Sequence, residues 1–201
     1  MSIAHQVEDF LLTDALLAQA LSPADSEMAN SERLLLQQED QDTLNLSLFL
    51  DQDIVDRLKE DSPAEQLHDG NLDAFWLAVE GVSHFLYLLW NVKHQRPVSC
   101  LEMELQAEID KFYAACELLR EQNTRGQEGP LFQILFDRCE FIQGSNRPRY
   151  IRANELAARF CRQRLEQGLA SDKQALRTEL RRFYRLSHHH KLQFARQQLR
   201  R

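Results

Sequence analysis

The spacing of apolar residues divides most of the chain into helical segments. Apolar positions recur every three to four residues, and Ser-Pro, Arg-Pro and glycine-containing breaks separate the periodic stretches, as in amphipathic helices. Helices are therefore predicted over Ile3–Leu21, from Ser22-Pro23 to Gln38, and over Asp51–Glu60, Leu72–Lys93, Ser99–Asn123, Leu131–Ile142, Arg152–Gln167, Ser171–Leu186 and Ser187–Leu199. Capping boxes are expected at Ser99/Glu102 and at Ser171/Gln174.

Residues 43–50 follow a different pattern. Leucine stands at every second position, and this period of two predicts a strand: Leu44, Leu46, Leu48 and Leu50. A lone strand leaves backbone N–H and C=O groups unpaired, so it needs a partner. The candidate partners are the segment 132–142, the region around Tyr150, and the same strand of a second subunit.

The predicted helix Leu72–Lys93 is apolar around almost its whole circumference, which is typical of a helix buried in a core. Its apolar stretch is about as long as the shortest membrane spans. Glu80 and His84 lie in the middle of that stretch, and carrying them through lipid is costly, so no membrane contact is expected. Gly81 interrupts the helix at a cost of about 1 kcal/mol in helix propensity, which predicts the close approach of another backbone.

The composition agrees with a helical fold. The chain has 33 Leu against 6 Ile and 6 Val, whereas strands favour β-branched residues, so an all-β sandwich or barrel is excluded. The predicted fold class is mainly α, a helical bundle-like single domain around a buried central helix, with a minor β element near residues 43–50.

Charge is distributed unevenly along the chain. Residues 1–73 carry 17 acidic against 3 basic side chains, whereas residues 147–201 carry 4 against 15. We therefore expect an acidic helical core domain over 1–146 and a basic C-terminal helical region over 147–201, packed on the same domain. Such asymmetry indicates either surfaces for partners or attraction between the two parts of the chain.

Several kinds of chemistry find no support in the sequence. The four cysteines form no CxxC pair, and no apolar export signal follows Met1, so a cytoplasmic protein with reduced thiols is expected. A Gly-rich phosphate loop, a GxSxG elbow and a dinucleotide fingerprint are all missing from the sequence. No cofactor is therefore expected.

The first candidate site is a polar stripe on the predicted helix 72–93. Glu80, His84, Tyr87 and Asn91 are spaced so that they share one helical face. The next helix offers Glu104 and Glu108, which an antiparallel arrangement could bring to the stripe. The spacing is not the Glu-x-x-His of di-iron bundles, and there is no HExxH motif, so no metal is predicted. The stripe is interpreted as a set of hydrogen-bonded polar residues that fix the register of the helix against its neighbours or line an interface. Alternatively, His84 is a general base oriented by Glu80 or Glu108.

The second candidate site is basic and lies near the C-terminus. The candidate binding residues are Arg177, Arg181, Arg182, Arg185, His188 and Lys191. Interleaved aromatic residues, including Phe183, Tyr184 and Phe194, could stack on unpaired bases while the cations contact phosphates. A solvated basic face that meets acidic protein surface explains the same residues.

Three functions follow from these features. The preferred one is a non-catalytic helical interaction or regulatory protein of the cytoplasm, with a protein partner or self-association through its acidic and basic surfaces. The first alternative is a nucleic-acid-associated protein that binds through residues 147–201. The second alternative is an enzyme with a carboxylate and histidine site made of Glu80, His84, Glu104 and Glu108.

Overall fold

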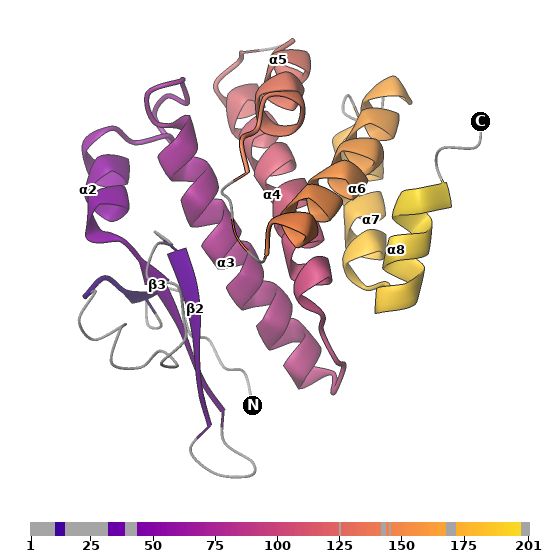
Figure 1. Ribbon diagram of the computed structural model, residues 1–201. Helices are drawn as coiled ribbons and strands as arrows, with labels where there is room; N and C mark the ends of the chain where they lie inside the picture. The colour runs from indigo at the N-terminus through magenta and orange to yellow at the C-terminus, as the bar shows by residue number, and fades with distance from the viewer. Residues whose placement is uncertain are drawn as a thin grey trace. The chain divides into compact units, whose positions relative to one another are not determined.

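The fold is mainly α-helical with a minor β element, as the sequence predicts (Figure 1). The structure is a computed structural model that describes residues 11–14, 32–38, 44–124, 126–141, 144, 146–167 and 172–197. The chain divides into two compact units, residues 1–89 and residues 90–201. Helix α3 (Leu72–Lys93) continues across the boundary between them.

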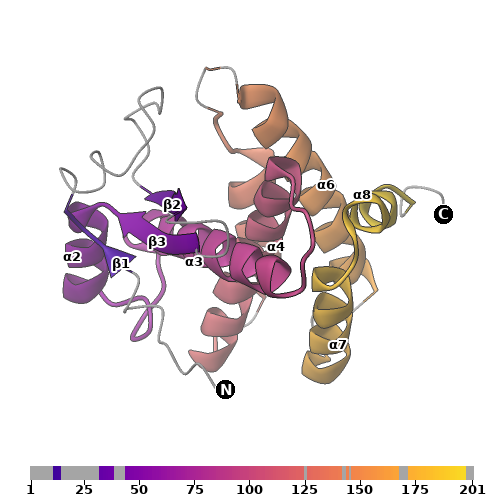
Figure 2. The same cartoon turned by 90° about the horizontal axis from the view of Figure 1, so that it is seen from below.

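The first unit holds a three-stranded sheet, helix α2 (Gln52–Glu60) and most of α3. The strands are β1 (Leu11–Leu12), β2 (Glu32–Gln38) and β3 (Leu44–Leu50). Figure 2 shows β3 between the other two strands, with β1 parallel and β2 antiparallel to it. In this register Leu34 lies opposite Leu48, and Glu32 lies opposite Leu50.

The strand predicted over 43–50 is confirmed, but the two candidate partners within the chain are wrong. Strands β1 and β2 pair with it, whereas residues 133–137 and Tyr150 are helical. Where the structure describes them, the helices predicted over 3–21 and from 22 to 38 are therefore also wrong; their remaining residues lie outside the described ranges. Strand β2 consists of Glu, Arg, Leu and Gln, all good helix formers, so pairing with β3 overrides local propensity here.

The two faces of the sheet follow the period of two. On one face, Leu48 and Leu50 pack with Phe85 of α3. Partly buried residues extend this cluster, from the strands and from both helices: Leu11, Leu34, Leu46, Val55, Ala78 and Val82. On the opposite face, Leu35 and Phe49 pack with Leu12. The apolar face of β3 is thus covered by helix, which is why its leucines alternate.

Helix α3 has the bounds that the sequence predicts, and Gly81 has the role of a close-contact residue. A Cβ atom at Gly81 would lie 2.8 Å from Cδ1 of Leu48 and 3.4 Å from Cδ2 of Leu50. The glycine therefore lets β3 approach the helix, although the atoms that fill the space belong to side chains and not to a backbone.

Helix α3 also has a partly exposed side. Leu86, Leu89 and Val92 are 43%, 46% and 46% exposed. Among the described helices, α3 is long and apolar enough to cross a membrane by length and composition, a test that core helices of soluble proteins also pass. The buried polar residues His84 and Asn91 interrupt its apolar surface.

The second unit is helical. It contains α4 (Cys100–Glu121), α5 (Glu128–Phe132), the π-helical turn η2 (Gln133–Asp137), α6 (Arg147–Glu166), α7 (Lys173–Tyr184) and α8 (His188–Gln197). Helices α4 and α6 make the most extensive contact. Fully buried residues form the core between them, among them Ile109 and Phe112 of α4 and Leu156 and Phe160 of α6.

The ends of these helices partly match the predicted signals. At α4 the capping box is present: Ser99 Oγ accepts a hydrogen bond from the Glu102 amide at 3.3 Å, and the Glu102 carboxylate accepts one from the Ser99 amide at 3.0 Å. At α7 the cap is Asp172, whose carboxylate accepts from the amides of Gln174 and Ala175. The predicted cap Ser171 lies outside the described residues.

Two other helices differ from their predicted bounds. The helix predicted over 131–142 is in fact α5 followed by η2, and it ends at Asp137. Asn154 donates a hydrogen bond to the Leu135 carbonyl of η2 at 3.3 Å, which satisfies an acceptor inside the core. Helix α6 begins at Arg147, before the predicted Arg152, because Pro148 fits the first turn of a helix.

Candidate functional site

Three side chains with metal-ligand chemistry meet in the first unit. Glu80 and His84 lie on α3 as predicted, and the third residue is Glu32 of β2. One ligand atom from each of these three residues lies within 4.8 Å of the others. Nδ1 of His84 lies 3.0 Å from Oε1 of Glu32. We call these three residues the Glu32 cluster.

The strand geometry explains why Glu32 reaches α3. Glu32 is two residues before Leu34, so both side chains lie on the sheet face that packs against the helix. The Glu32 side chain is 12% exposed and that of His84 is 8% exposed. Sequence reasoning missed Glu32 because it placed this residue in a helix, and no local signal distinguishes it from the other acidic residues of the N-terminal third.

Glu104 and Glu108, the other two residues of the predicted enzyme site, contact cations of the second unit. A carboxylate oxygen of Glu104 lies 3.3 Å from a guanidinium nitrogen of Arg149. The Glu108 carboxylate lies 2.6 Å from Nζ of Lys111. The carboxylate in contact with His84 Nδ1 is that of Glu32 and not that of Glu108.

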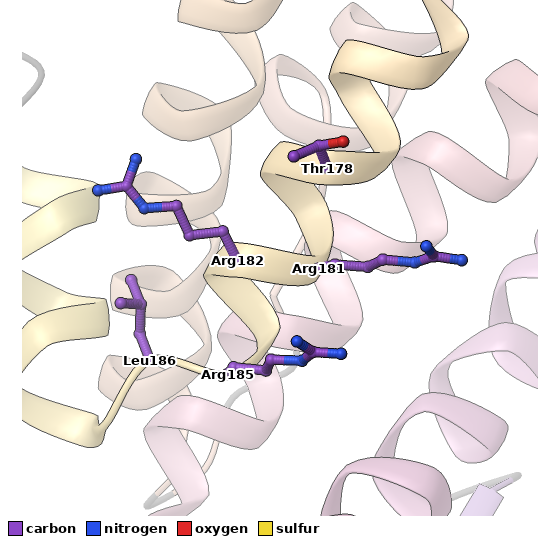
Figure 3. Close-up of a pocket in the computed structure, with 5 residues that line it drawn as sticks. All are labelled: Thr178, Arg181, Arg182, Arg185 and Leu186. Atoms are coloured by element: carbon purple, nitrogen blue, oxygen red, sulfur yellow. The ribbon is translucent and has the colours of Figure 1, made fainter.

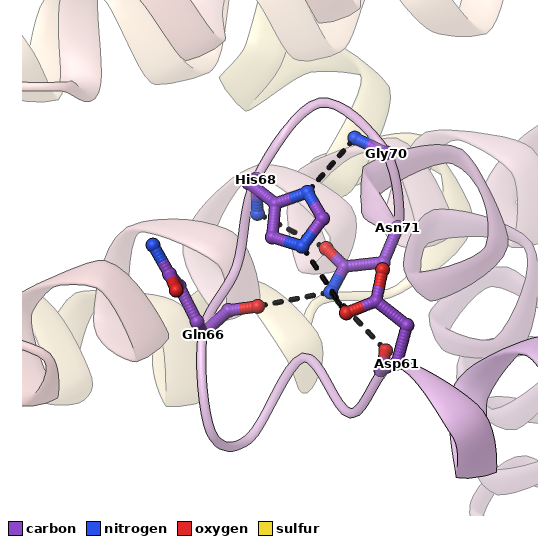
Figure 4. Close-up of polar contacts among 5 residues, drawn as sticks. All are labelled: Asp61, Gln66, His68, Gly70 and Asn71. Atoms are coloured by element: carbon purple, nitrogen blue, oxygen red, sulfur yellow. Dashed lines mark hydrogen bonds and ion pairs between the residues drawn. The ribbon is translucent and has the colours of Figure 1, made fainter.

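A second histidine of the first unit belongs to the loop between α2 and α3 (Figure 4). Nδ1 of His68 accepts a hydrogen bond from the Gly70 amide at 3.1 Å, so Nε2 carries the proton and donates to Asp61 at 3.1 Å. The fully buried Asn71 side chain donates to the Gln66 carbonyl at 2.9 Å and accepts from the His68 amide at 3.0 Å. Both ring nitrogens of His68 are therefore used to fix the loop.

Basic residues occur every fourth position along α7: Lys173, Arg177, Arg181 and Arg185. The first two meet Glu117 of α4: Lys173 forms an ion pair with it, and Arg177 lies 3.6 Å away. The hydrogen bond from Lys173 lowers the pKa of Glu117. The N-terminal half of this basic row is therefore neutralised within the unit.

The C-terminal half of α7 presents cations to solvent. Arg181, Arg182 and Arg185 are exposed, and none forms an ion pair with a carboxylate in the described part of the chain. Together with Thr178 and Leu186 they line a surface hollow of about 500 Å³. Figure 3 shows Arg181 and Arg185 extending side by side and Arg182 extending from the other side of the helix. We call these three residues the arginine face.

The remaining candidate binding residues have contacts inside the unit. His188 lies 2.9 Å from the buried Glu102 carboxylate. Lys191 is fully buried and donates to Gln106 at 2.8 Å, so it offers no charge to a partner. Phe183 is 1% exposed and packs on Phe160 at a ring separation of 4.4 Å, which leaves its face closed to a nucleic-acid base.

The basic residues of α6 are also largely matched by carboxylates of the same unit. The ion pairs are Arg149–Glu104, Arg152–Glu155, Arg162–Asp137 and Arg164–Glu179. By sequence, residues 1–89 carry 18 acidic and 3 basic side chains, a net charge of −15, whereas residues 90–201 carry 13 and 21, a net charge of +8. The two units are therefore opposite in charge, even though many cations of the second unit have local partners.

The buried Lys191 gives the protein a specific pH dependence. Burial lowers its pKa from 10.5, the ordinary value expected in the unfolded chain, to about 7. At pH values between these two pKa values, the unfolded chain binds more protons than the folded chain. The free energy of unfolding therefore rises with pH by up to about 1.4 kcal/mol per pH unit. We expect chemical denaturation at pH 7 to 9 to show this increase in the wild-type protein and to lack it in Lys191→Met.

The control for this measurement is Lys59→Met, which removes a lysine whose side chain is 70% exposed and should follow the wild-type curve. Measurements stop near pH 9 because burial raises the pKa of Cys116 from 9.0 to about 12, which favours the unfolded chain at higher pH. Parallel curves for wild type and Lys191→Met would exclude this role of Lys191.

Comparison of the chain with protein-family models, with curated proteins and with solved structures gave no match. The function is therefore inferred from the residues of this chain.

Proposed function

We propose that this protein is a non-catalytic helical interaction protein of the cytoplasm that binds an acidic segment of a partner protein through the arginine face. The observation that carries the proposal is the difference between the two halves of α7. Lys173 and Arg177 meet Glu117, whereas the three arginines of the arginine face have no carboxylate partner in the described chain.

The chemistry of the arginine face suits carboxylates. Guanidinium groups hold carboxylates through two parallel hydrogen bonds, and Arg181 and Arg185 lie one helical turn apart (Figure 3). Arg96 lies at the same end of α7, where its guanidinium donates to the Arg185 carbonyl at 2.9 Å. An acidic side chain beside Arg181 and Arg185 would therefore meet two guanidinium groups.

A protein partner fits this face better than a nucleic acid. Extended polyanions need a track of cations, but four of the six arginines of α6 are paired with carboxylates of the same unit. Of the three aromatic residues that could stack on a base, Phe183 is buried, and Tyr184 and Phe194 are only partly exposed.

The test replaces the three arginines of the arginine face together. We expect Arg181→Gln/Arg182→Gln/Arg185→Gln to weaken binding of a fluorescein-labelled poly-glutamate peptide by about tenfold in fluorescence anisotropy. Three exposed charge pairs at about 0.5 kcal/mol each correspond to roughly that factor. A second, separate titration uses a poly-thymidine oligonucleotide, which represents nucleic acid as the alternative ligand.

The matched control is Arg57→Gln/Lys59→Gln/Arg162→Gln, which removes the same charge from other exposed positions. At physiological salt this control should bind like the wild type, because none of its three residues lines the hollow. An equal loss in both triple variants would show non-specific attraction and contradict the proposal. Tighter binding of the oligonucleotide than of the peptide would replace it with the nucleic-acid alternative.

A further inference from the structure

We propose that the Glu32 cluster is a binding site for a divalent transition-metal ion, with Zn²⁺ as its preferred occupant. The proposal is independent of the arginine face, which lies in the other compact unit. It concerns Glu32 of β2 together with Glu80 and His84 of α3, two elements that are far apart in the sequence and meet within the first unit.

The distances agree with coordination of one ion. Nitrogen and oxygen ligands lie about 2.1 Å from zinc, so two ligands at a tetrahedral angle are about 3.4 Å apart. Nδ1 of His84 and Oε1 of Glu32 are 3.0 Å apart, and the atoms of all three residues lie within 4.8 Å. A glutamate carboxylate covers the remaining difference by rotation about its side-chain torsions.

The burial of the cluster makes a cation favourable. The Glu32 side chain is 12% exposed, and its second carboxylate oxygen, Oε2, is buried without a hydrogen-bond partner in the described residues. A buried carboxylate oxygen without a partner costs free energy, and a second carboxylate, that of Glu80, lies within the same cluster. A divalent ion would neutralise both carboxylates and coordinate the oxygen.

Gly81 lies beside the Glu32 cluster and lets β3 approach α3 closely. A Cβ atom at this position would collide with Leu48 of β3, whereas its distance of 3.5 Å from Oε2 of Glu32 would be an ordinary contact. Gly81 lies between Glu80 and His84 on α3, and β2 pairs with β3, so the close approach of the sheet occurs beside both ligands. The packing that holds the sheet on α3 therefore also assembles the site.

The ligand set selects the class of metal. Imidazole favours zinc and other late first-row ions, whereas Mg²⁺ and Ca²⁺ prefer sites made of oxygen ligands alone. Three protein ligands leave a fourth tetrahedral position for water or for a group from another molecule. The geometry thus points to Zn²⁺ with an open position and not to a closed structural zinc site.

The experiment is calorimetric titration of the full metal-free chain with Zn²⁺, with Mg²⁺ as the comparison ion. We expect one Zn²⁺ per chain, a rise in thermal stability with Zn²⁺, and no comparable binding of Mg²⁺. Glu32→Gln/Glu80→Gln should weaken Zn²⁺ binding by about tenfold or more, since loss of a residue that only orients a metal ligand already costs about 10- to 100-fold. His84→Ala should do the same.

Controls separate this site from other zinc-binding groups. His68→Ala removes a histidine of the same unit that is held by Asp61, and it should leave the affinity unchanged. His189→Gln/His190→Gln tests the exposed histidine run, and X-ray absorption at the zinc edge tests the cysteines through sulfur ligands.

The double variant Glu32→Gln/Glu80→Gln retains a hydrogen-bond acceptor for His84. Its circular dichroism without metal shows whether the fold is kept. If His84→Ala does not fold, the Zn²⁺ affinity of the double variant tests the proposal. The proposal is overturned by wild-type affinity in Glu32→Gln/Glu80→Gln, by loss of binding in the His189/His190 variant, by a sulfur ligand, or by no binding of Zn²⁺ at all.

Discussion

Replacement of Arg164 by Ala is expected to lower the free energy of unfolding by about 3–5 kcal/mol, because it breaks a buried ion pair and leaves a cavity. Arg164 is 1% exposed, and its guanidinium donates to Glu179 at 2.7 Å and to the Phe160 carbonyl at 3.3 Å. The same group lies 3.7 Å from the centre of the Phe160 ring, so it joins α6 to α7 through the ion pair with Glu179 and stacks on an aromatic ring of its own helix.

Urea denaturation of three variants tests this interpretation. Arg164→Lys keeps the charge but not the planar group, so we expect it to recover part of the lost stability and not all of it. Arg162→Ala removes an arginine whose side chain is 57% exposed, and its effect should stay below about 1 kcal/mol. Wild-type stability in Arg164→Lys would show that a point charge is sufficient and that stacking contributes nothing.

A second large effect is expected at Leu48, the fully buried leucine of β3. Leu48→Ala should lower the free energy of unfolding by about 2–5 kcal/mol, because the neighbouring Leu50 and Phe85 cannot close the cavity completely. The same substitution removes the atom that lies 2.8 Å from the position of a Cβ at Gly81.

The effect of Gly81→Ala on the free energy of unfolding should therefore depend on the residue at position 48. In the wild-type background its clash with Leu48 is expected to cost about 1–3 kcal/mol, which outweighs or cancels the gain of about 1 kcal/mol in helix propensity. In the Leu48→Ala background the clash is gone, and Gly81→Ala should stabilise the protein. A double-mutant cycle measured by chemical denaturation gives the coupling; additive effects would mean that the two positions do not meet.

Much of the helical framework follows from local sequence signals. The pattern of apolar and capping residues in the sequence predicts four features correctly: the bounds of α2 and α3, the capping box at Ser99 and the strand over 44–50. These features depend on contacts within one or two turns, or on the period of one strand, and such contacts are encoded locally. The start of α6, where Pro148 lies in the first turn, and the short η2 turn were not predicted.

The candidate sites depend on the sequence to different degrees. Glu80 and His84 were identified from their helical spacing, and the arginines of α7 from the concentration of basic residues near the C-terminus. That spacing could not show that Lys191 is buried, that Arg177 meets Glu117, or that Arg181 and Arg185 face solvent, because these facts depend on which helices pack together.

The sequence by itself determined the helices α2, α3 and α4, the central strand and the opposite charges of the two ends. Only the tertiary structure decided that residues 32–38 form a strand. Their propensity favours a helix, but pairing with β3 satisfies backbone N–H and C=O groups that would otherwise be unpaired. That single pairing turns Glu32 toward α3 and brings it to His84, 52 residues further along the chain. Local spacing can place Glu80 and His84 on one face of a helix. The position of Glu32 beside them depends on the register of the sheet, which is a long-range property.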